Sequence, residues 1–295
     1  MKNIIVITGG AGFVGTNLIS FLLKNTKYKI LSIDNYSSGL KINHIKNKKV
    51  KYIKGNTRNI STLLNSKKNK INAIFHFGEF SRIYQSFLKM GECIDSNTVG
   101  SHAVFNFCLN NKIKLIYSAT SASLGNKGRD KDLSPYAFTK SINLELLENL
   151  KKWFKMKYEI IYFYNVYGPK QISIGNMATV IGIFENAYKN KKPLPVVRPG
   201  TQSRKFTHIS DTVKVCYDAW KKNKCRHYSI SSKKDYSILE VAKLFGSKIK
   251  LLPARSGERY ASALTNMNLS NKVYKNFGKI NLKTYIEKFK NAHKR

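Results

Sequence analysis

Short apolar runs alternate with amphipathic stretches along the first 165 residues of the chain. The apolar runs are rich in Ile and Val, as buried strands are, and we expect strands at residues 3–8, 29–33, 50–53, 73–77, 113–117 and 159–163. Apolar positions at helical spacing predict helices at residues 13–23, 95–109 and 135–154. This alternation predicts an α/β fold with a doubly wound parallel sheet and crossover helices.

The pattern loosens after Gly168. Three prolines between residues 193 and 199 mark loops, a strand is expected near residues 226–230, and Ser237 with Glu240 predicts the capping box of a short helix. We therefore expect a large domain followed by a smaller, mixed C-terminal lobe. The predicted boundaries place residues 1–168 and about 206–233 in the large domain, and residues 169–205 and 234–295 in the lobe.

A glycine-rich turn lies between the first expected strand and the first expected helix. Gly9, Gly12 and Gly15 give the spacing G-x-x-G-x-x-G, which lets the backbone approach a pyrophosphate at the N-terminus of a helix. Asp34 closes the second expected strand, where a carboxylate accepts both ribose hydroxyls of NAD and repels the 2′-phosphate of NADP. The glycines alone could form only a tight turn, and Asp34 alone could be a turn residue. Together they predict a Rossmann-like domain that binds NAD.

A tyrosine and a lysine lie four residues apart at the start of the third expected helix. Tyr136 and Lys140 share one helix face, after Ser134 at the N-cap and Pro135 at the first helical position. A phenol pKa of about 10 is too high for a base at neutral pH, and a nearby ammonium lowers it. The spacing alone also occurs by chance in a lysine-rich chain. The hydroxyl-rich residues 118–123, however, follow a strand and would lie at the edge of the sheet where such folds bind ligands.

The composition adds a net charge of +37, which is compatible with a nucleic-acid partner. Only nine of the 53 basic residues are arginine, and the scattered lysines favour a coding bias and solvated helix faces over nucleic-acid recognition. No apolar run approaches the roughly 20 residues of a membrane span, and we expect no signal peptide at the N-terminus. The four cysteines have no CxxC spacing, so we expect free thiols and no metal site. We expect a cytoplasmic protein with no membrane partner.

Six further segments follow the glycine turn in a recognisable order. They are Asp34-Asn35, Gly55-Asn56-Thr57-Arg58, His76-Phe77-Gly78, Asn97, Tyr164-Asn165-Val166-Tyr167-Gly168-Pro169 and Arg204-Lys205-Phe206-Thr207-His208-Ile209-Ser210-Asp211. With the glycine turn and the Tyr-x-x-x-Lys pair, they resemble the extended short-chain dehydrogenase/reductase superfamily, and within it the NAD-dependent sugar epimerase/dehydratase family. The resemblance covers nearly the whole chain.

The resemblance implies an enzyme similar to UDP-glucose 4-epimerase, active in carbohydrate metabolism and polysaccharide biosynthesis, with NAD as its prosthetic group. It implies that Thr120 hydrogen-bonds the reacting sugar oxygen, that Tyr136 moves its proton, and that Lys140 holds the nicotinamide ribose. The residues implied to contact NAD are Gly9, Gly12, Phe13, Val14, Asp34, Asn35, Asn56, Thr57, Phe77, Gly78, Asn97, Tyr136, Lys140 and Tyr164. Those implied to bind the nucleotide sugar are Thr120, Asn165, Asn176, Arg204 and Arg255. A homodimer formed through the helices at residues 95–109 and 135–154 is also implied.

Three departures from the family pattern bear on function. Ser121-Ala122 follow Thr120 where the dehydratases carry an Asp-Glu pair, which disfavours the elimination of water. Asn56 replaces an aspartate that contacts adenine, and an amide can still bond that base. Glu79 and Arg82 stand where small residues are usual, and they would either tune specificity or form a structural ion pair. A nucleotide-sugar C4 dehydrogenase or reductase remains the alternative function, and a non-catalytic NAD- or RNA-binding protein a remote one.

Overall fold

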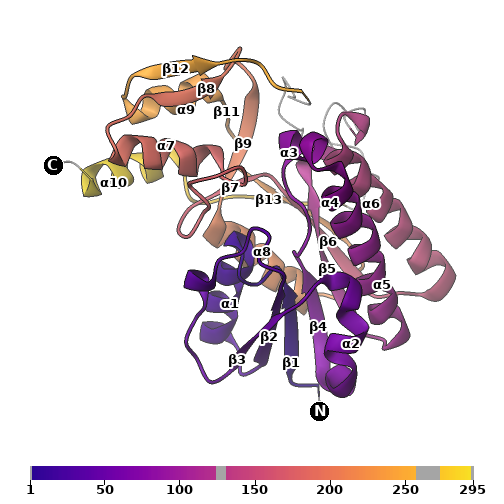
Figure 1. Ribbon diagram of the computed structural model, residues 1–295. Helices are drawn as coiled ribbons and strands as arrows, with labels where there is room; N and C mark the ends of the chain where they lie inside the picture. The colour runs from indigo at the N-terminus through magenta and orange to yellow at the C-terminus, as the bar shows by residue number, and fades with distance from the viewer. Residues whose placement is uncertain (1, 124–130, 257–272, 294–295) are drawn as a thin grey trace.

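A large parallel sheet organises most of the chain in the computed structural model, which describes residues 2–123, 131–256 and 273–293 (Figure 1). Its strand order is β13-β10-β6-β5-β4-β1-β2-β3, and every neighbouring pair is parallel. The predicted α/β fold is therefore confirmed. The eight strands are β1 (Ile4–Thr8), β2 (Lys29–Asp34), β3 (Val50–Lys54), β4 (Ile71–His76), β5 (Lys114–Thr120), β6 (Tyr158–Phe163), β10 (His227–Ser231) and β13 (Val273–Phe277).

Helices cover both faces of this sheet, which explains why its strands read as continuous apolar runs. On one face, Ile5 belongs to an apolar cluster with α1 (Phe13–Asn25) and α8 (Ile209–Lys221). On the other face, Val6 belongs to a cluster with helices α2, α5 and α6. These three helices are α2 (Ile60–Leu64), α5 (Ser101–Asn110) and α6 (Pro135–Phe154).

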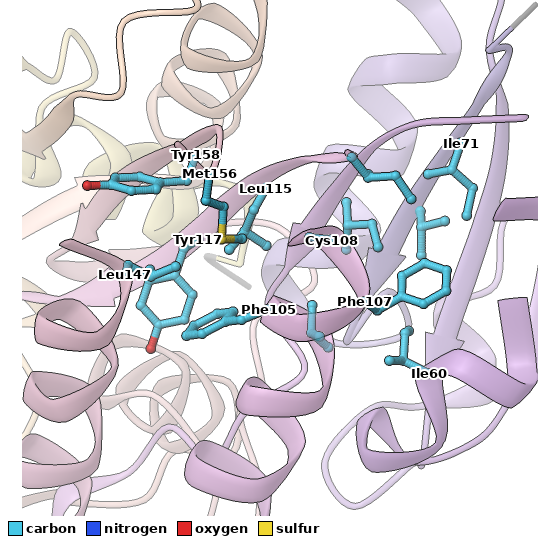
Figure 2. Packing of buried hydrophobic residues seen from close by; sticks show 14 of the residues in the cluster. Ile60, Ile71, Phe105, Phe107, Cys108, Leu115, Tyr117, Leu147, Met156 and Tyr158 are labelled. Atoms are coloured by element: carbon cyan, nitrogen blue, oxygen red, sulfur yellow. The ribbon is translucent and has the colours of Figure 1, made fainter. Parts of the chain in front are cut away.

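Aromatic and aliphatic side chains hold α5 and α6 against the centre of the sheet. Phe105 of α5, Tyr117 of β5 and Leu147 of α6 are fully buried and lie together (Figure 2). The rings of Phe105 and Tyr117 meet edge to face, with their centroids 5.4 Å apart. This packing anchors the long helix α6, which carries Tyr136 and Lys140 at its N-terminal end.

The expected helix at residues 95–109 consists of two parts, a π-helical turn (Asp95–Gly100) and α5. Two short helices, α3 (Ile83–Leu88) and α4 (Met90–Ile94), come just before the turn. The π-helical turn carries Asn97, and such turns are frequent at functional sites. Gly100 closes the turn, and a Cβ at this position would collide with the hydroxyl of Thr57. The turn therefore packs closely against Thr57.

The C-terminal lobe has its own small sheets and its own core. The elements of the lobe are β7 (Asn165–Tyr167), β8 (Leu194–Val197), β9 (Ser203–His208), β11 (Asp235–Ser237), β12 (Ile249–Leu252), α7 (Val180–Lys189), α9 (Ile238–Phe245) and α10 (Leu282–Ala292). The predicted capping box is confirmed, because the hydroxyl of Ser237 accepts a bond from the backbone N–H of Glu240 and the Glu240 carboxylate accepts one in return. Among the described residues, no helix has the length and apolar character that crossing a membrane requires.

The predicted domain boundary needs one correction. Strand β13 lies in the region 234–295 that was assigned to the lobe, yet it pairs in parallel with β10 at the edge of the large sheet. Its sequence, Val-Tyr-Lys-Asn-Phe, is short and half polar, so the apolar-run criterion does not detect it. The chain thus returns from the lobe to the large sheet before it ends in α10.

Candidate active site

The glycine loop is shaped to receive a dinucleotide. Gly9 has a φ of +69°, and a Cβ at this position would lie 2.8 Å from the backbone carbonyl of Phe77. Helix α1 begins after Gly12, with no side chain capping its free N–H groups. The first helical residues, Phe13, Val14 and Gly15, line a cavity, so this positive end of the helix is open to an anion.

Asp34 lies at the end of β2, beside the same loop. One carboxylate oxygen accepts a hydrogen bond from the Ala11 N–H at 2.9 Å, and the other accepts one from the Tyr36 N–H at 2.8 Å. Burial raises the pKa of Asp34, and these two backbone bonds oppose that shift. Asp34 therefore fixes the glycine loop, and it is one of the residues that line the cavity.

A single cavity of about 740 Å³ joins the predicted cofactor and substrate residues. It is lined by all the residues implied to contact NAD except Asn97, and by all five residues implied to bind the nucleotide sugar. The residues implied on the cofactor side that line it are Gly9, Gly12, Phe13, Val14, Asp34, Asn35, Asn56, Thr57, Phe77, Gly78, Tyr136, Lys140 and Tyr164. Those implied on the substrate side are Thr120, Asn165, Asn176, Arg204 and Arg255. The structure thus brings together segments that lie far apart in the sequence.

Asn97 is the one residue of the predicted cofactor set that does not line the cavity. It is fully buried and is not among the residues that line the cavity. Its side chain accepts a bond from the Phe80 N–H at 2.6 Å, and donates to the Phe80 carbonyl at 3.1 Å and to the Thr139 hydroxyl at 3.2 Å. Asn97 therefore clamps the segment after β4 to helix α6, and its contact with NAD stays a prediction.

The three predicted catalytic residues come from two neighbouring elements. Thr120 ends β5, and its hydroxyl accepts a bond from the Ala122 N–H at 3.1 Å. Tyr136 and Lys140 lie in the first two turns of α6, whose N-cap Ser134 accepts a bond from the Ala137 N–H. The backbone N–H of Tyr136 donates to the hydroxyl of Ser86 in α3, at 3.2 Å.

A buried carboxylate, Glu79, is the partner of Lys140. The two side chains are 2% and 4% exposed and form an ion pair, and Lys140 also donates to the carbonyl of Ser118. Of the two roles expected for Glu79 and Arg82, the ion pair between them does not form. Arg82 instead donates to the carbonyls of Met177 and Ser81, because its side chain extends toward the lobe. Burial lowers the pKa of Lys140, and the charge of Glu79 opposes that effect.

Three more donors surround Glu79. One of its oxygens accepts bonds from Ser101 at 2.8 Å, from Tyr117 at 3.0 Å and from Asn143 at 3.3 Å. None of these contacts was predicted from the sequence. Asn143 lies three residues after Lys140 and so on the same helix face, which is the one signal that could have indicated it.

A chain of hydrogen bonds links the glycine loop to this carboxylate through His76. The hydroxyl of Thr8 accepts the N–H groups of Phe77 and Gly78 and lies 2.7 Å from His76 Nδ1. His76 Nε2 lies 2.9 Å from the hydroxyl of Ser101, which donates to Glu79. Burial lowers the pKa of His76 to about 4, so the ring is neutral. The network assigns its proton to Nε2, with Thr8 donating to Nδ1.

The substrate end of the cavity contains the predicted arginines. Arg204 of β9 is 8% exposed and donates to the carbonyl of Ser203 at 2.8 Å. Arg255 lies over the ring of Tyr84, 5.1 Å from its centroid. Asn165 donates to the carbonyl of Lys205 at 3.1 Å, which leaves its amide oxygen available to a ligand.

These features define an α/β nucleotide-binding enzyme with a dinucleotide loop and a Thr-Tyr-Lys set at the edge of its sheet. The chain belongs to the NAD dependent epimerase/dehydratase family, whose model matches residues 5–231. NAD is therefore the cofactor of this chain.

Curated relatives of this chain include both a dehydratase and an epimerase. The chain is 28% identical over 266 residues to a dTDP-D-glucose 4,6-dehydratase of Dictyostelium discoideum, with 81% of this chain but only 60% of that relative covered. It is 30% identical over 225 residues to an ADP-L-glycero-D-manno-heptose-6-epimerase of Brachyspira hyodysenteriae, with 72% of this chain and 70% of the relative covered.

The fold is also that of a solved structure. A UDP-glucose 4-epimerase of Thermotoga maritima with UDP-glucose superposes with a TM-score of 0.85 at 21% identity, and 99% of this chain and 100% of that one are covered. At this identity the likeness supports the fold alone.

Proposed function

We propose that this chain is a nucleotide-sugar 4-epimerase that keeps NAD as a prosthetic group. The observation that carries the proposal is the continuous cavity lined by the glycine loop, by Thr120, Tyr136 and Lys140, and by Arg204 and Arg255. A nucleotide sugar held by the two arginines can therefore reach the same space as a cofactor held by the glycine loop. Guanidinium groups suit the diphosphate, because their donors match its oxygens in pairs.

The residues of the chain divide the work of moving a proton and holding the sugar. When bound, NAD supplies the hydride acceptor for carbon 4 of the sugar and later the hydride donor. Tyr136 takes the proton of the C4 hydroxyl as a general base and returns it as a general acid. Thr120 orients that oxygen with a hydrogen bond. The arginines hold the diphosphate while the 4-keto sugar turns over and presents its other face.

The carboxylates that line the cavity are both engaged in other contacts, which favours epimerisation over dehydration. Elimination of water requires an acid and a base beside the sugar. Among the described residues that line the cavity, the carboxylates are Asp34 and Glu79. Asp34 holds the glycine loop and Glu79 pairs with Lys140, so neither is available for that chemistry. Ser121 and Ala122 stand after Thr120 where an acidic pair would be needed.

A C4 dehydrogenase or reductase would use the same residues, because the fold fixes the hydride step but not its fate. The two functions differ in the cofactor balance. An epimerase interconverts the two C4 epimers with no net change in NADH. A dehydrogenase accumulates NADH in proportion to its product, which absorbance detects directly.

The test is Tyr136→Phe, assayed with a panel of UDP- and dTDP-sugars by NMR of the C4 epimers. The variant keeps the ring, so its melting temperature and its content of NAD should match those of the wild type. Its kcat should fall by about 10²-fold or more with a small change in KM, because the phenol acts mainly in the transition state. Near-wild-type turnover of a confirmed sugar substrate by this variant would refute the proposed role.

The proposal includes a homodimer formed through α4, the π-helical turn and α6. Ile94, Val99, Phe138 and Ile142 expose apolar surface on these elements. Light scattering should therefore give twice the chain mass, and Phe138→Lys should reduce it to the mass of one chain. A wild type that scatters as a monomer at micromolar concentration would contradict this part.

A further inference from the structure

One guanidinium in the cavity has no carboxylate partner among the described residues. Arg82 precedes α3 and lines the cavity with Tyr136 and Lys140. Its Nε and Nη2 both donate to the carbonyl of Met177, Nε at 3.1 Å, and its Nη1 donates to the carbonyl of Ser81 at 2.9 Å. These acceptors fix the position of the side chain but carry no charge.

The remaining donors of Arg82 suit a planar anion. A guanidinium has five N–H groups, and three are used, so Nη1 and Nη2 each retain one. Two parallel N–H groups on neighbouring nitrogens form the two-point bond that Arg makes with a carboxylate. A cation taken out of water without a partner is costly, so a bound ligand is the natural source of the missing charge.

The position of Arg82 indicates which part of a ligand would meet it. The Ser86 hydroxyl of the adjoining helix α3 accepts the backbone N–H of Tyr136. The phenol of Tyr136 also lies close enough to oppose the effect of burial, which lowers the pKa of Arg82. Met177 is next to Asn176, which lines the substrate end. Under the function proposed above, Arg82 would therefore lie at the reacting sugar, whereas Arg204 and Arg255 are the residues assigned to the diphosphate.

We propose that Arg82 is a receptor for a carboxylate on the sugar, so that the preferred substrate is a nucleotide-linked sugar acid. The proposal rests on the function above for the placement of the sugar at Tyr136. The charges of the site agree with this proposal. The carboxylate of Glu79 is compensated by Lys140, so it is not a partner for Arg82. A neutral hexose would leave the charge of Arg82 unmatched.

The experiment measures binding by calorimetry, so it does not require turnover. UDP-glucuronate, UDP-glucose and UDP are titrated into the NAD-loaded wild type, Arg82→Gln and Arg226→Gln, and the dTDP forms are measured in parallel. Arg226 is exposed and does not line the cavity, which makes its variant the matched control. The wild type and the control should bind the acidic sugar about tenfold or more tighter than the neutral one, as expected for a charge-assisted bond.

In Arg82→Gln the preference for the acidic sugar should fall to about onefold. Equal binding of the two sugars by the wild type in both nucleotide series overturns the proposal. An equal loss of affinity for both sugars and for the free nucleotide diphosphate also overturns it, because Arg82 would then hold the shared diphosphate.

Turnover separates this proposal from the function on which it rests. If the acidic sugar binds preferentially through Arg82 but is not epimerised, the proposed 4-epimerase activity is refuted and the proposed role of Arg82 stands. Epimerisation of neutral sugars without any acidic preference would do the reverse.

Discussion

Glu79 is the residue whose removal should be most damaging for its size. Its carboxylate pairs with Lys140 and accepts bonds from Ser101, Tyr117 and Asn143. In Glu79→Ala the buried ammonium of Lys140 loses its carboxylate partner and keeps its bond to the Ser118 carbonyl. The three neutral donors lose their acceptor. Removing one partner of a buried ion pair costs about 3–5 kcal/mol, which is a large share of a total stability of about 5–15 kcal/mol. At about 2 °C per kcal/mol, the melting temperature should fall by roughly 6–10 °C.

Urea unfolding measures this loss, with every variant at the same NAD concentration because a bound ligand adds stability. Lys140→Met leaves Glu79 as the unpaired charge, so it should also destabilise the fold. The double variant Glu79→Ala/Lys140→Met contains neither charge, and its loss should be smaller than the sum of the single losses by at least about 1 kcal/mol.

The control for this cycle is an exposed ion pair. Glu92 lies 2.9 Å from Lys89, and both side chains are about half exposed. Glu92→Ala should change stability by less than about 1 kcal/mol. A loss for Glu79→Ala no larger than that of this control, or strictly additive losses in the cycle, would mean that the buried pair does not couple Glu79 to Lys140.

Three other measurements probe the remaining parts of the site. The pKa of His76 is lowered to about 4, so between about pH 6.5 and 4 the unfolded chain binds a proton there and the folded chain does not. As the pH falls from about 6.5 to 4, the free energy of unfolding should therefore fall by about 3 kcal/mol. His76→Gln should flatten this pH dependence. Asp34→Ala should raise the Kd for NAD by about tenfold or more in a fluorescence titration, and a wild type that binds NADP as tightly as NAD would contradict this reading of Asp34. Arg204→Ala should raise the KM for a nucleotide sugar by about tenfold, and Arg255→Ala, whose side chain is exposed, by less; an unchanged KM in both would mean that the diphosphate lies elsewhere.

The elements that periodicity could identify are those buried on both faces of the sheet. Strands β1 and β2 read as apolar runs because α1 and α8 cover one side and the α5–α6 pair the other. Strand β13 escaped because an edge strand of five residues needs few apolar positions. The helix at residues 95–109 was predicted as continuous, since the π-helical turn results from the tertiary fit of Gly100 against Thr57 and leaves no mark in the periodicity.

The site was predictable where a local motif carries the chemistry. The glycine spacing with Asp34, and the pair Tyr136 and Lys140, identify residues that do line one cavity. The contacts of Asn97 and Glu79 could not be predicted, because their partners are distant in sequence. Asn97 bonds Phe80 and Thr139, and Glu79 finds Lys140 in place of its near neighbour Arg82. Tertiary packing determines such partners, and the spacing of residues in the sequence does not reveal them.

The unusual Glu79 acquires a physical reason once the hydrogen bonds are followed in order. Thr8 immediately precedes the glycine loop, and its hydroxyl holds the backbone after β4 and the ring of His76. His76 passes this constraint through Ser101 to the carboxylate, and the carboxylate fixes the ammonium of Lys140. The side chain of each member of this chain is buried and has hydrogen-bond partners, which is the condition under which a polar network rigidifies a core instead of weakening it. The glycine loop and the helix that carries Tyr136, the proposed acid and base, are therefore held in place relative to each other by one continuous set of bonds. A small residue at position 79 would break that set at its last link.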